Sequence, residues 1–241
     1  MTVAVQLYTV RATLADDPAG TLTRLAALGY DAVEGFGLVE LADVLATGLA
    51  AAGLPMPSAH ASLIGADADA AFAAADRLRV GTLIQPWTDP ERWTTRAGID
   101  TIAAELAAVA DRAAGAGLVI GYHNHAFELE NRVAGVSALE YFAAILDPRI
   151  VLEVDTYWAE VGGEPAPALL RRLGERVKLL HVKDGPRVQD TMTQTAVGSG
   201  GLPIADILAA APAARVVVEL DAYAGDVFDA LAESRRFLAG L

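Results

Sequence analysis

Histidine and carboxylate residues recur at the ends of short apolar runs in this chain of 241 residues. The runs LVIGY, IVLEV, KLLHV and VVVEL contain or lead into such residues, and all four histidines of the chain lie at run ends. Histidines without a shared role would be spread over helices and loops as well. The polar residues at these ends are His60, His123, His125, Glu128, Asp155, His181, Lys183, Glu219 and Asp221.

Carboxylates and imidazoles that follow apolar strands can hold a divalent cation. Burying Asp155, His181 or Glu219 costs free energy unless the group is paired or binds a metal ion. Two or three carboxylates with one imidazole suit Mn²⁺, Mg²⁺ or Co²⁺ better than a structural zinc. Open coordination positions would let substrate oxygens bind, which polarises a carbonyl and acidifies the adjacent C–H bond. Asp221 shares a strand face with Glu219 and could exchange roles with it, whereas Glu153, on the face of Asp155, could pair with an internal cation.

Alternating strands and helices must position these groups. Continuously apolar runs are typical of parallel strands buried on both faces, and each strand–helix unit averages about thirty residues, the size of a βαβ unit. The predicted strands lie near 3–9, 32–36, 55–61, 82–87, 118–125, 150–156, 178–183 and 215–220. The predicted helices lie near 18–29, 40–53, 67–79, 97–116, 137–146, 165–176, 203–211 and 225–239.

Eight such units favour a closed (β/α)8 TIM barrel over an open α/β sheet. The first strand lacks the following GxGxxG turn that an open dinucleotide-binding sheet carries. GSGG at 198–201 comes late, and we expect it to form a flexible loop over the site. No Pro/Ser-rich linker divides the chain, so residues 1–241 are predicted to form one domain. In a TIM barrel the functional groups lie at the carboxyl ends of the strands, where the residues named above fall.

Composition limits the classes of partner. The formal charge of 18 − 31 = −13 argues against a nucleic-acid partner. The apolar runs are too short to span a membrane, and the N-terminal segment lacks the basic region of a signal peptide. The absence of cysteine excludes disulfides, thiolate metal sites and a cysteine nucleophile. We therefore expect a cytoplasmic protein that acts on a small molecule, with no membrane partner.

The order of these motifs resembles the xylose isomerase-like superfamily of sugar (phosphate) isomerases and epimerases. HNHAFE, a strand ending in Asp155, HVKD and a final VVVE run follow one another at barrel-like spacing, and the similarity extends over essentially the whole chain. HNHxxE is shared with the inosose dehydratase-like and 3-keto-glycoside-acting branch. The resemblance implies a metal-dependent sugar isomerase or epimerase built on a TIM barrel.

The resemblance also implies a set of metal ligands. It assigns one divalent ion, with Mn²⁺ favoured and Mg²⁺, Co²⁺ or Zn²⁺ as alternatives, to Glu128, Asp155, His181 and Glu219. Many epimerases of the superfamily carry a glutamate inside the fifth strand, where this chain has the HNH triplet. His123 could therefore replace Glu128 as the ligand and leave Glu128 to bind substrate, although we favour Glu128.

The catalytic residues that the resemblance implies are His125, Glu128, Glu219 and Lys183. His125 or a ligand glutamate removes the proton between a ketone and the neighbouring hydroxyl, and the metal holds the resulting enediolate with Lys183 nearby. Reprotonation then gives an epimer or an isomer, whereas loss of a β-hydroxyl gives a dehydratase or lyase on the same site. A histidine with an ordinary pKa near 6.5 suits such proton transfer at neutral pH.

Weaker predictions concern substrate contacts by His123, His60, Glu34 and Trp158. Each has a structural alternative, because a histidine or glutamate at a strand end can simply be hydrogen-bonded in the core. An aromatic residue such as Trp158 is more often core packing than the wall of a sugar site.

Two other functions compete with the isomerase interpretation. An abasic-site endonuclease uses the same barrel but needs a multi-zinc cluster and a basic DNA face, which four histidines and a charge of −13 do not favour. A non-catalytic binding barrel would not need three buried ligand-type residues at successive strand ends. The sequence leaves open the identity of the sugar, its phosphorylation and the oligomeric state, a homodimer included.

Overall fold

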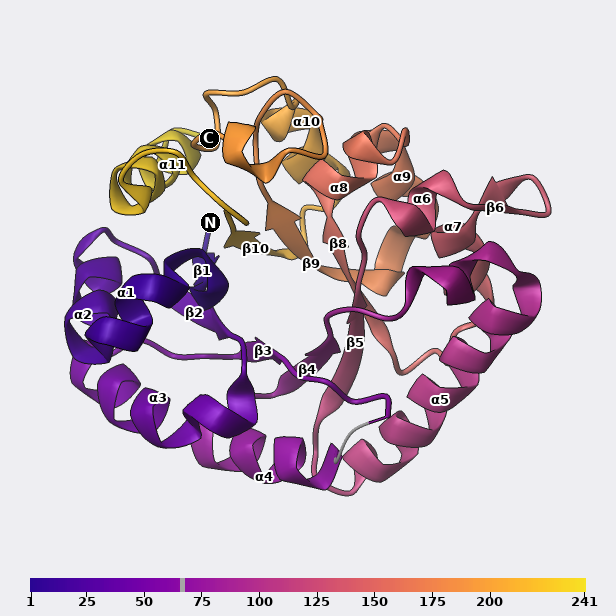
Figure 1. Cartoon of the computed structure of the whole chain (residues 1–241), viewed down its shortest axis with the longest axis horizontal. Helices are drawn as coiled ribbons and strands as arrows, with labels where there is room; N and C mark the ends of the chain where they lie inside the picture. Colours follow the sequence, from indigo (N-terminus) through magenta and orange to yellow (C-terminus); the bar gives the residue numbers. More distant parts are fainter. Residues whose placement is uncertain (66–67) are drawn as a thin grey trace.

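A closed barrel of eight parallel strands forms the centre of the molecule (Figure 1). The computed structural model describes residues 1–65 and 68–241. The strands follow one another around the barrel in chain order, and β1 pairs with β10 to close it, which confirms the predicted (β/α)8 TIM barrel. The barrel strands are β1 (Val3–Gln6), β2 (Ala32–Gly35), β3 (Ser58–His60), β4 (Thr82–Gln85), β5 (Val119–His123), β8 (Val151–Asp155), β9 (Val177–Val182) and β10 (Arg215–Val218).

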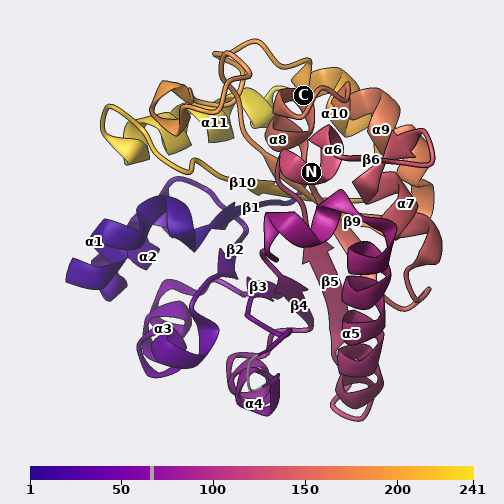
Figure 2. The same cartoon turned by 45° about the vertical axis from the view of Figure 1, so that its right-hand side comes forward.

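Helices return the chain between successive barrel strands. Figure 2 shows α3, α4 and α5 standing outside the strands that they connect. No helix of the described residues is long and apolar enough to cross a membrane. The helices are α1 (Arg11–Asp16), α2 (Pro18–Ala27), α3 (Leu38–Ala52), α4 (Ala68–Leu78), α5 (Arg96–Ala114), α6 (Phe127–Glu130), α7 (Ala138–Ile145), α8 (Thr156–Val161), α9 (Ala166–Leu173), α10 (Ile204–Ala210) and α11 (Val227–Ala239).

The predicted elements are all present, but several strands end earlier than expected. β1 ends at Gln6 because the Gln6 side chain accepts a hydrogen bond from the Tyr8 amide and begins a 3-10 turn over Leu7–Val10. The sequence did not predict α1, α6, α8 or the small hairpin of β6 (Arg132–Val133) and β7 (Val136–Ser137). The first residue of the helix expected over 67–79 lies outside the described residues.

Polar side chains fix where several of the helices begin. Asp17 caps α2 by accepting a hydrogen bond from the amide of Gly20, and Thr95 caps α5 in the same way. Ser137 and Glu140 form a reciprocal capping box at the start of α7. Because such caps satisfy amides that have no partner inside the helix, they set the register in which each helix packs on the barrel.

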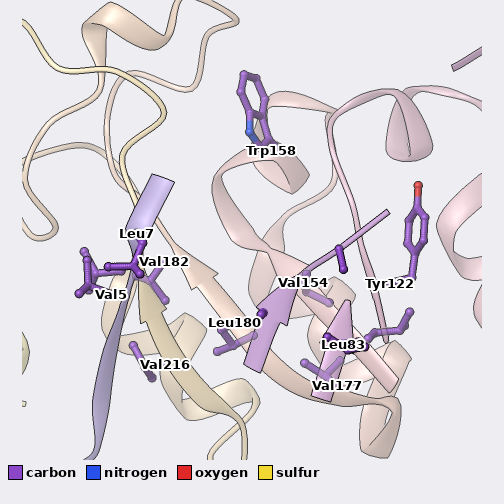
Figure 3. Packing of buried hydrophobic residues seen from close by; sticks show 14 of the residues in the cluster. Val5, Leu7, Leu83, Tyr122, Val154, Trp158, Val177, Leu180, Val182 and Val216 are labelled. Atoms are coloured by element: carbon purple, nitrogen blue, oxygen red, sulfur yellow. The ribbon is translucent and has the colours of Figure 1, made fainter. Parts of the chain in front are cut away.

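The apolar core has two layers. Most buried apolar residues, such as Val154, Leu180 and Val182, pack in the layer between strands and helices (Figure 3). A smaller cluster fills the interior of the barrel, and we call it the barrel floor: Ala4, Ala32, Ile84, Leu179 and Val217. The side chains alternate between the two layers because successive residues of a strand point to opposite faces.

Candidate active site

Polar side chains lie directly above the barrel floor. Residues two positions apart in a strand share a face, so the residue two positions after a floor residue also points into the barrel. Ala4, Ala32, Leu179 and Val217 are followed in this way by Gln6, Glu34, His181 and Glu219, all of them buried. A further step of two reaches Lys183 after β9 and Asp221 after β10, at the carboxyl ends of the strands, where TIM barrels carry their functional groups.

Four buried side chains at the carboxyl ends of the strands come together as a candidate metal site. The ligand atoms of His123, Asp155, His181 and Glu219 all lie within 4.8 Å of one another. Asp155 Oδ2 is buried and forms an ion pair of 2.9 Å with Lys183 Nζ. Carboxylate oxygens and imidazole nitrogens are ligands that divalent metal ions accept in proteins. Two imidazoles and two carboxylates therefore fit a divalent ion.

Buried glutamates hold the two imidazoles in place. His181 Nδ1 lies 2.7 Å from Glu219 Oε2, and His181 Nε2 lies 2.7 Å from Glu34 Oε1. His123 Nδ1 lies 3.0 Å from Glu153 Oε2. Carboxylates outside the ligand group, here Glu34 and Glu153, set the orientation and tautomer of ligand histidines.

The charges of this network move its pKa values in opposite directions. Burial and the negative charge of Glu153 raise the pKa of Glu34. Burial also disfavours the charged form of Glu153, but the charges of His181 and His60 outweigh it and hold the pKa of Glu153 well below its usual range. Similarly, burial would lower the pKa of His181, but Glu153 and Glu219 raise it well above the ordinary value.

A second group of possible ligands overlaps the first one. His60, His123, Glu153 and His181 also bring their ligand atoms within 4.8 Å of one another. Glu153 Oε2 lies 2.7 Å from His60 Nε2, whereas Glu153 Oε1 is buried without a hydrogen bond. The partners of Glu153 are thus imidazoles, and the positive charges of His181 and His60 are the internal cations with which it pairs. Because the two groups share His123 and His181, they describe neighbouring positions of one polar layer.

Lys183 joins the remaining carboxylates. Its ammonium group lies 2.9 Å from Asp155 and 2.8 Å from both Glu219 and Asp221. Burial alone would lower the pKa of Lys183, but the three carboxylates raise it well above its usual value. The charge of Lys183, followed by that of His181, in turn keeps the pKa of Glu219 well below its usual range against the effect of burial.

Glu128 lies outside both groups of possible ligands. Tyr122 donates a hydrogen bond of 2.7 Å to Glu128 Oε1, and the amide of His125 donates one of 2.8 Å to Oε2. Burial raises the pKa of Glu128 to about 8, although both hydrogen bonds act against it. The structure therefore groups His123, rather than the favoured Glu128, with the other predicted ligands, because Glu128 lies within α6 and accepts hydrogen bonds from Tyr122 and the His125 amide.

His125 lies where a proton acceptor is expected, but its pKa is not ordinary. Its ring lines the pocket at the barrel mouth, and its Nδ1 is buried without a hydrogen-bond partner. Burial, followed by the positive charge of Lys183, lowers the pKa of His125 to about 4. The imidazole is therefore neutral at neutral pH and has a free lone pair.

The weaker predictions have different outcomes. His60 and His123 both line the mouth pocket. Glu34 is fully buried below it, where Gln6 and Ser58 donate hydrogen bonds to its carboxylate. Trp158 is not among the pocket-lining residues; it is buried and belongs to the apolar cluster drawn in Figure 3. Glu34 thus supports the polar layer and Trp158 packs beside it.

The mouth pocket has a volume of about 590 Å³. The polar residues of its lining include His60, His123, His125, Glu219 and Asp221, and most of the other lining residues are apolar. A concave, largely apolar cavity with a few convergent polar groups is the usual form of a small-molecule site. The candidate metal ligands His123 and Glu219 belong to this lining, so a small molecule in the pocket reaches them directly.

A family model described as the xylose isomerase-like TIM barrel matches residues 22–239. The chain belongs to this family. No curated protein sequence matches the chain. The family membership agrees with the observed barrel and with the position of the polar layer at its mouth.

Solved structures share this fold at low sequence identity. A sugar phosphate isomerase/epimerase from Parabacteroides distasonis ATCC 8503 is 21% identical with a TM-score of 0.83, and the match covers 100% of this chain and 98% of that one. A 3-keto-D-glucoside 4-epimerase from E. coli is 16% identical with a TM-score of 0.75 and full coverage of both chains, 100% each. A D-allulose 3-epimerase from Methylomonas sp. is 15% identical with a TM-score of 0.73, covering 100% of this chain and 97% of that one.

Several residues of the site were not predicted from the sequence. Gln6 lies two positions after Ala4, so the period of the strand could have identified it. Asn124 Oδ1 accepts a hydrogen bond of 3.0 Å from the amide of Asp155, and Gln194 donates one of 2.8 Å to Asp221. Gln194 belongs to a long loop, and no local pattern signals its contact.

Proposed function

We propose that this protein is a divalent-metal-dependent sugar isomerase or epimerase that moves a proton next to a carbonyl group. The observation that carries the proposal is the group His123, Asp155, His181 and Glu219, because two of its members also line a sugar-sized pocket. Membership of the xylose isomerase-like family supports it. Two solved structures with the same fold, a D-allulose 3-epimerase and a 3-keto-D-glucoside 4-epimerase, are named for this class of reaction.

His123, Asp155, His181 and Glu219 would hold one ion, for which we favour Mn²⁺ over Mg²⁺, Co²⁺ and Zn²⁺. This replaces Glu128 by His123 in the predicted ligand set. A bound divalent ion supplies a Lewis acid that polarises a substrate carbonyl and acidifies the neighbouring C–H bond.

Two side chains of the mouth pocket are placed to move the proton. Glu219 is ionised, because Lys183 and His181 keep its pKa well below the usual range. His125 presents a neutral imidazole with an unpartnered Nδ1. We assign proton removal and return to this pair, one on each side of the sugar carbon. Lys183 acts as a positioning residue, since it is buried and bound to three carboxylates.

Deuterium exchange tests this function. Protein loaded with Mn²⁺ is mixed with 3-keto-D-glucose or an inosose in D₂O, and NMR follows the loss of the C–H signal beside the carbonyl relative to buffer. We expect rapid exchange, and Glu219→Gln should lower the rate at least about 100-fold. Glu175→Gln is the matched control, because the Glu175 side chain is 99% exposed and lies outside the site. The proposal is wrong if no keto-sugar exchanges faster with the loaded protein than in buffer.

A further inference from the structure

Among the described residues that line the mouth pocket there is no lysine or arginine. The acidic and histidine side chains of this lining are Glu40, His60, His123, His125, Glu219 and Asp221. A phosphate group is normally bound by charge-assisted hydrogen bonds, most often from Arg or Lys. A phosphorylated sugar would meet the carboxylates of Glu40, Glu219 and Asp221 there, and only the histidines and the proposed metal ion could attract its phosphate group.

Cations of neighbouring segments are engaged in other contacts. Lys183 is bound by three carboxylates, as described above. The guanidinium of Arg11 lies over the ring of Tyr8, 4.0 Å from its centroid, and donates a hydrogen bond to the Tyr8 carbonyl. Arg187 donates to a loop carbonyl and lies 3.7 Å from Glu160. None of the three is a pocket-lining residue.

The beginning of α3 also faces the pocket, through Gly37 and Leu38. The amino end of a helix attracts anions, because its free amides and its dipole favour negative charge. Here the first turn already contains Glu40, which itself lines the pocket. Its carboxylate interacts with the helix dipole and repels a second anion, so this helix end does not compensate for the missing cations.

The mouth pocket is also lined by three aromatic residues, Tyr8, Phe36 and Trp87, which follow β1, β2 and β4 and which we call the aromatic wall. Trp87 is 51% exposed and Tyr8 is 40% exposed, and the rings of Tyr8 and Phe36 meet edge to face at 5.5 Å. The Gln85 side chain donates a hydrogen bond of 2.5 Å to the Trp87 carbonyl, which fixes the backbone at this position. Exposed aromatic residues gathered in a concavity mark a surface for an apolar ligand group.

We propose that the substrate is an uncharged glycoside whose aglycone is apolar and ring-shaped. This inference rests on the proposed function: the keto-sugar ring occupies the end of the pocket formed by the histidines and Glu219, and the aglycone packs on the aromatic wall. The volume of about 590 Å³ lies within the range of roughly 300–1,000 Å³ that encloses drug-sized ligands. Such a cavity holds a sugar ring together with a second group of similar size.

Binding of three stable sugars tests the inference without turnover. Protein saturated with Mn²⁺ and freed of excess ion is titrated by calorimetry with phenyl β-D-glucoside, methyl β-D-glucoside and glucose 6-phosphate. We expect the phenyl glucoside to bind at least about tenfold more tightly than the methyl glucoside, a difference of about 1.4 kcal/mol. Glucose 6-phosphate should bind more weakly than the methyl glucoside.

Substitutions of Trp87 test whether the aromatic wall causes the preference for the phenyl glucoside. Trp87→Ala should reduce the advantage of the phenyl glucoside to below about threefold and leave methyl glucoside binding unchanged, whereas Trp87→Phe should keep most of it. Because Trp87 is half exposed, these variants should fold, and thermal melting checks this. Val44→Ala, an equally surface-placed change on α3 outside the pocket, is the matched control and should retain the full preference.

Three results would overturn the proposed substrate class: equal binding of the two glucosides, no binding of the phenyl glucoside, or tightest binding of glucose 6-phosphate. Each of them is distinguishable from failure of the proposed function, because binding is measured without proton exchange. A preference for glucose 6-phosphate would leave the proton-transfer proposal standing. Conversely, a protein that exchanges no proton but prefers the phenyl glucoside would retain the assigned pocket and lose the reaction.

Discussion

At the scale of single residues, Lys183 is the one buried cation shared by Asp155, Glu219 and Asp221. Removing one partner of a buried ion pair leaves charge without compensation and typically costs about 3–5 kcal/mol. We therefore expect Lys183→Met to lower the free energy of unfolding by about that amount, measured by urea denaturation in EDTA.

The other lysine of the chain provides the control for this prediction. Lys178 lies on β9, the strand that Lys183 follows; it is 47% exposed and pairs with Glu175 at 3.4 Å. Lys178→Met should change stability by no more than about 0.5 kcal/mol. An equal change in the free energy of unfolding for Lys183→Met and Lys178→Met would show that the charge of Lys183 is not needed to stabilise the buried carboxylates of the site.

Glu128 provides a pH-dependent prediction. Its pKa is raised from 4.5 to about 8 in the folded protein, chiefly by burial. The folded state therefore holds a proton that the unfolded state releases, so this residue's contribution is complete below pH 4.5 and is lost as the pH rises to about 8. Glu128→Gln removes the titration, and the stability of wild type relative to this variant should fall across that window in urea denaturation. A difference that stays constant with pH would contradict the assigned protonation.

The site residues that could be predicted from sequence are those governed by the period of a strand. His181 and Glu219 follow apolar residues of parallel strands, so their inward direction is fixed by alternation. Glu128 was misplaced because it follows the strand, where the chain has already turned into α6 and alternation no longer applies. Its partner Tyr122 lies on the outward face of β5, and only the folded chain brings the two together.

At the scale of elements, the conformation of the loop after β9 is held by hydrogen bonds to the carboxylate of Asp184. The GSGG segment was expected to be flexible, but Asp184 accepts hydrogen bonds from the amides of Gly185, Gly198, Gly200 and Leu202 at 2.8–3.1 Å. A Cβ at Gly200 would meet Asp184 Oδ1 at 2.2 Å, so the glycine is needed for this close approach. The sequence pattern indicated a loop but not the side chain that fixes it.

Asp184→Asn should loosen this loop. An asparagine has one acceptor oxygen, so part of the four hydrogen bonds is lost, at a cost of about 2 kcal/mol or more. We expect faster trypsin cleavage after Arg187, which lies within the loop. Asp190→Asn, a change at the cap of the short 3-10 helix in the same loop, is the control. Unchanged cleavage in Asp184→Asn would mean that the loop is held by other contacts.

The boundaries of elements were predicted less well than their order. The eight strand–helix units follow from hydrophobic periodicity, which is a property of whole segments. The ends of the strands depend on individual side chains, such as Gln6, which turns the chain at Tyr8, and Asp155, whose carboxylate accepts the Trp158 amide and begins α8. The same residues are also compatible with a longer strand, so the sequence alone does not show where the strand ends.

At the scale of the whole molecule, the proposed ligands come from strands β5 to β10, so an ion would link one half of the barrel wall. An ion that binds only the folded state stabilises it by about 2.7 kcal/mol at one hundred times its Kd. For a chain of this size that corresponds to a Tm increase of about 5–10 °C in differential scanning calorimetry. We expect Mn²⁺ to produce this increase and His123→Ala to abolish it, whereas a shift retained in His123→Ala would place the ion elsewhere.

Anomalous X-ray diffraction at the manganese edge, from crystals grown with MnCl₂, tests the central claim most directly. We expect one strong peak at the barrel mouth, from an ion bound by the side chains of His123, Asp155, His181 and Glu219. The absence of a peak there, or an ion bound by Glu128 with His123 turned away, would contradict it.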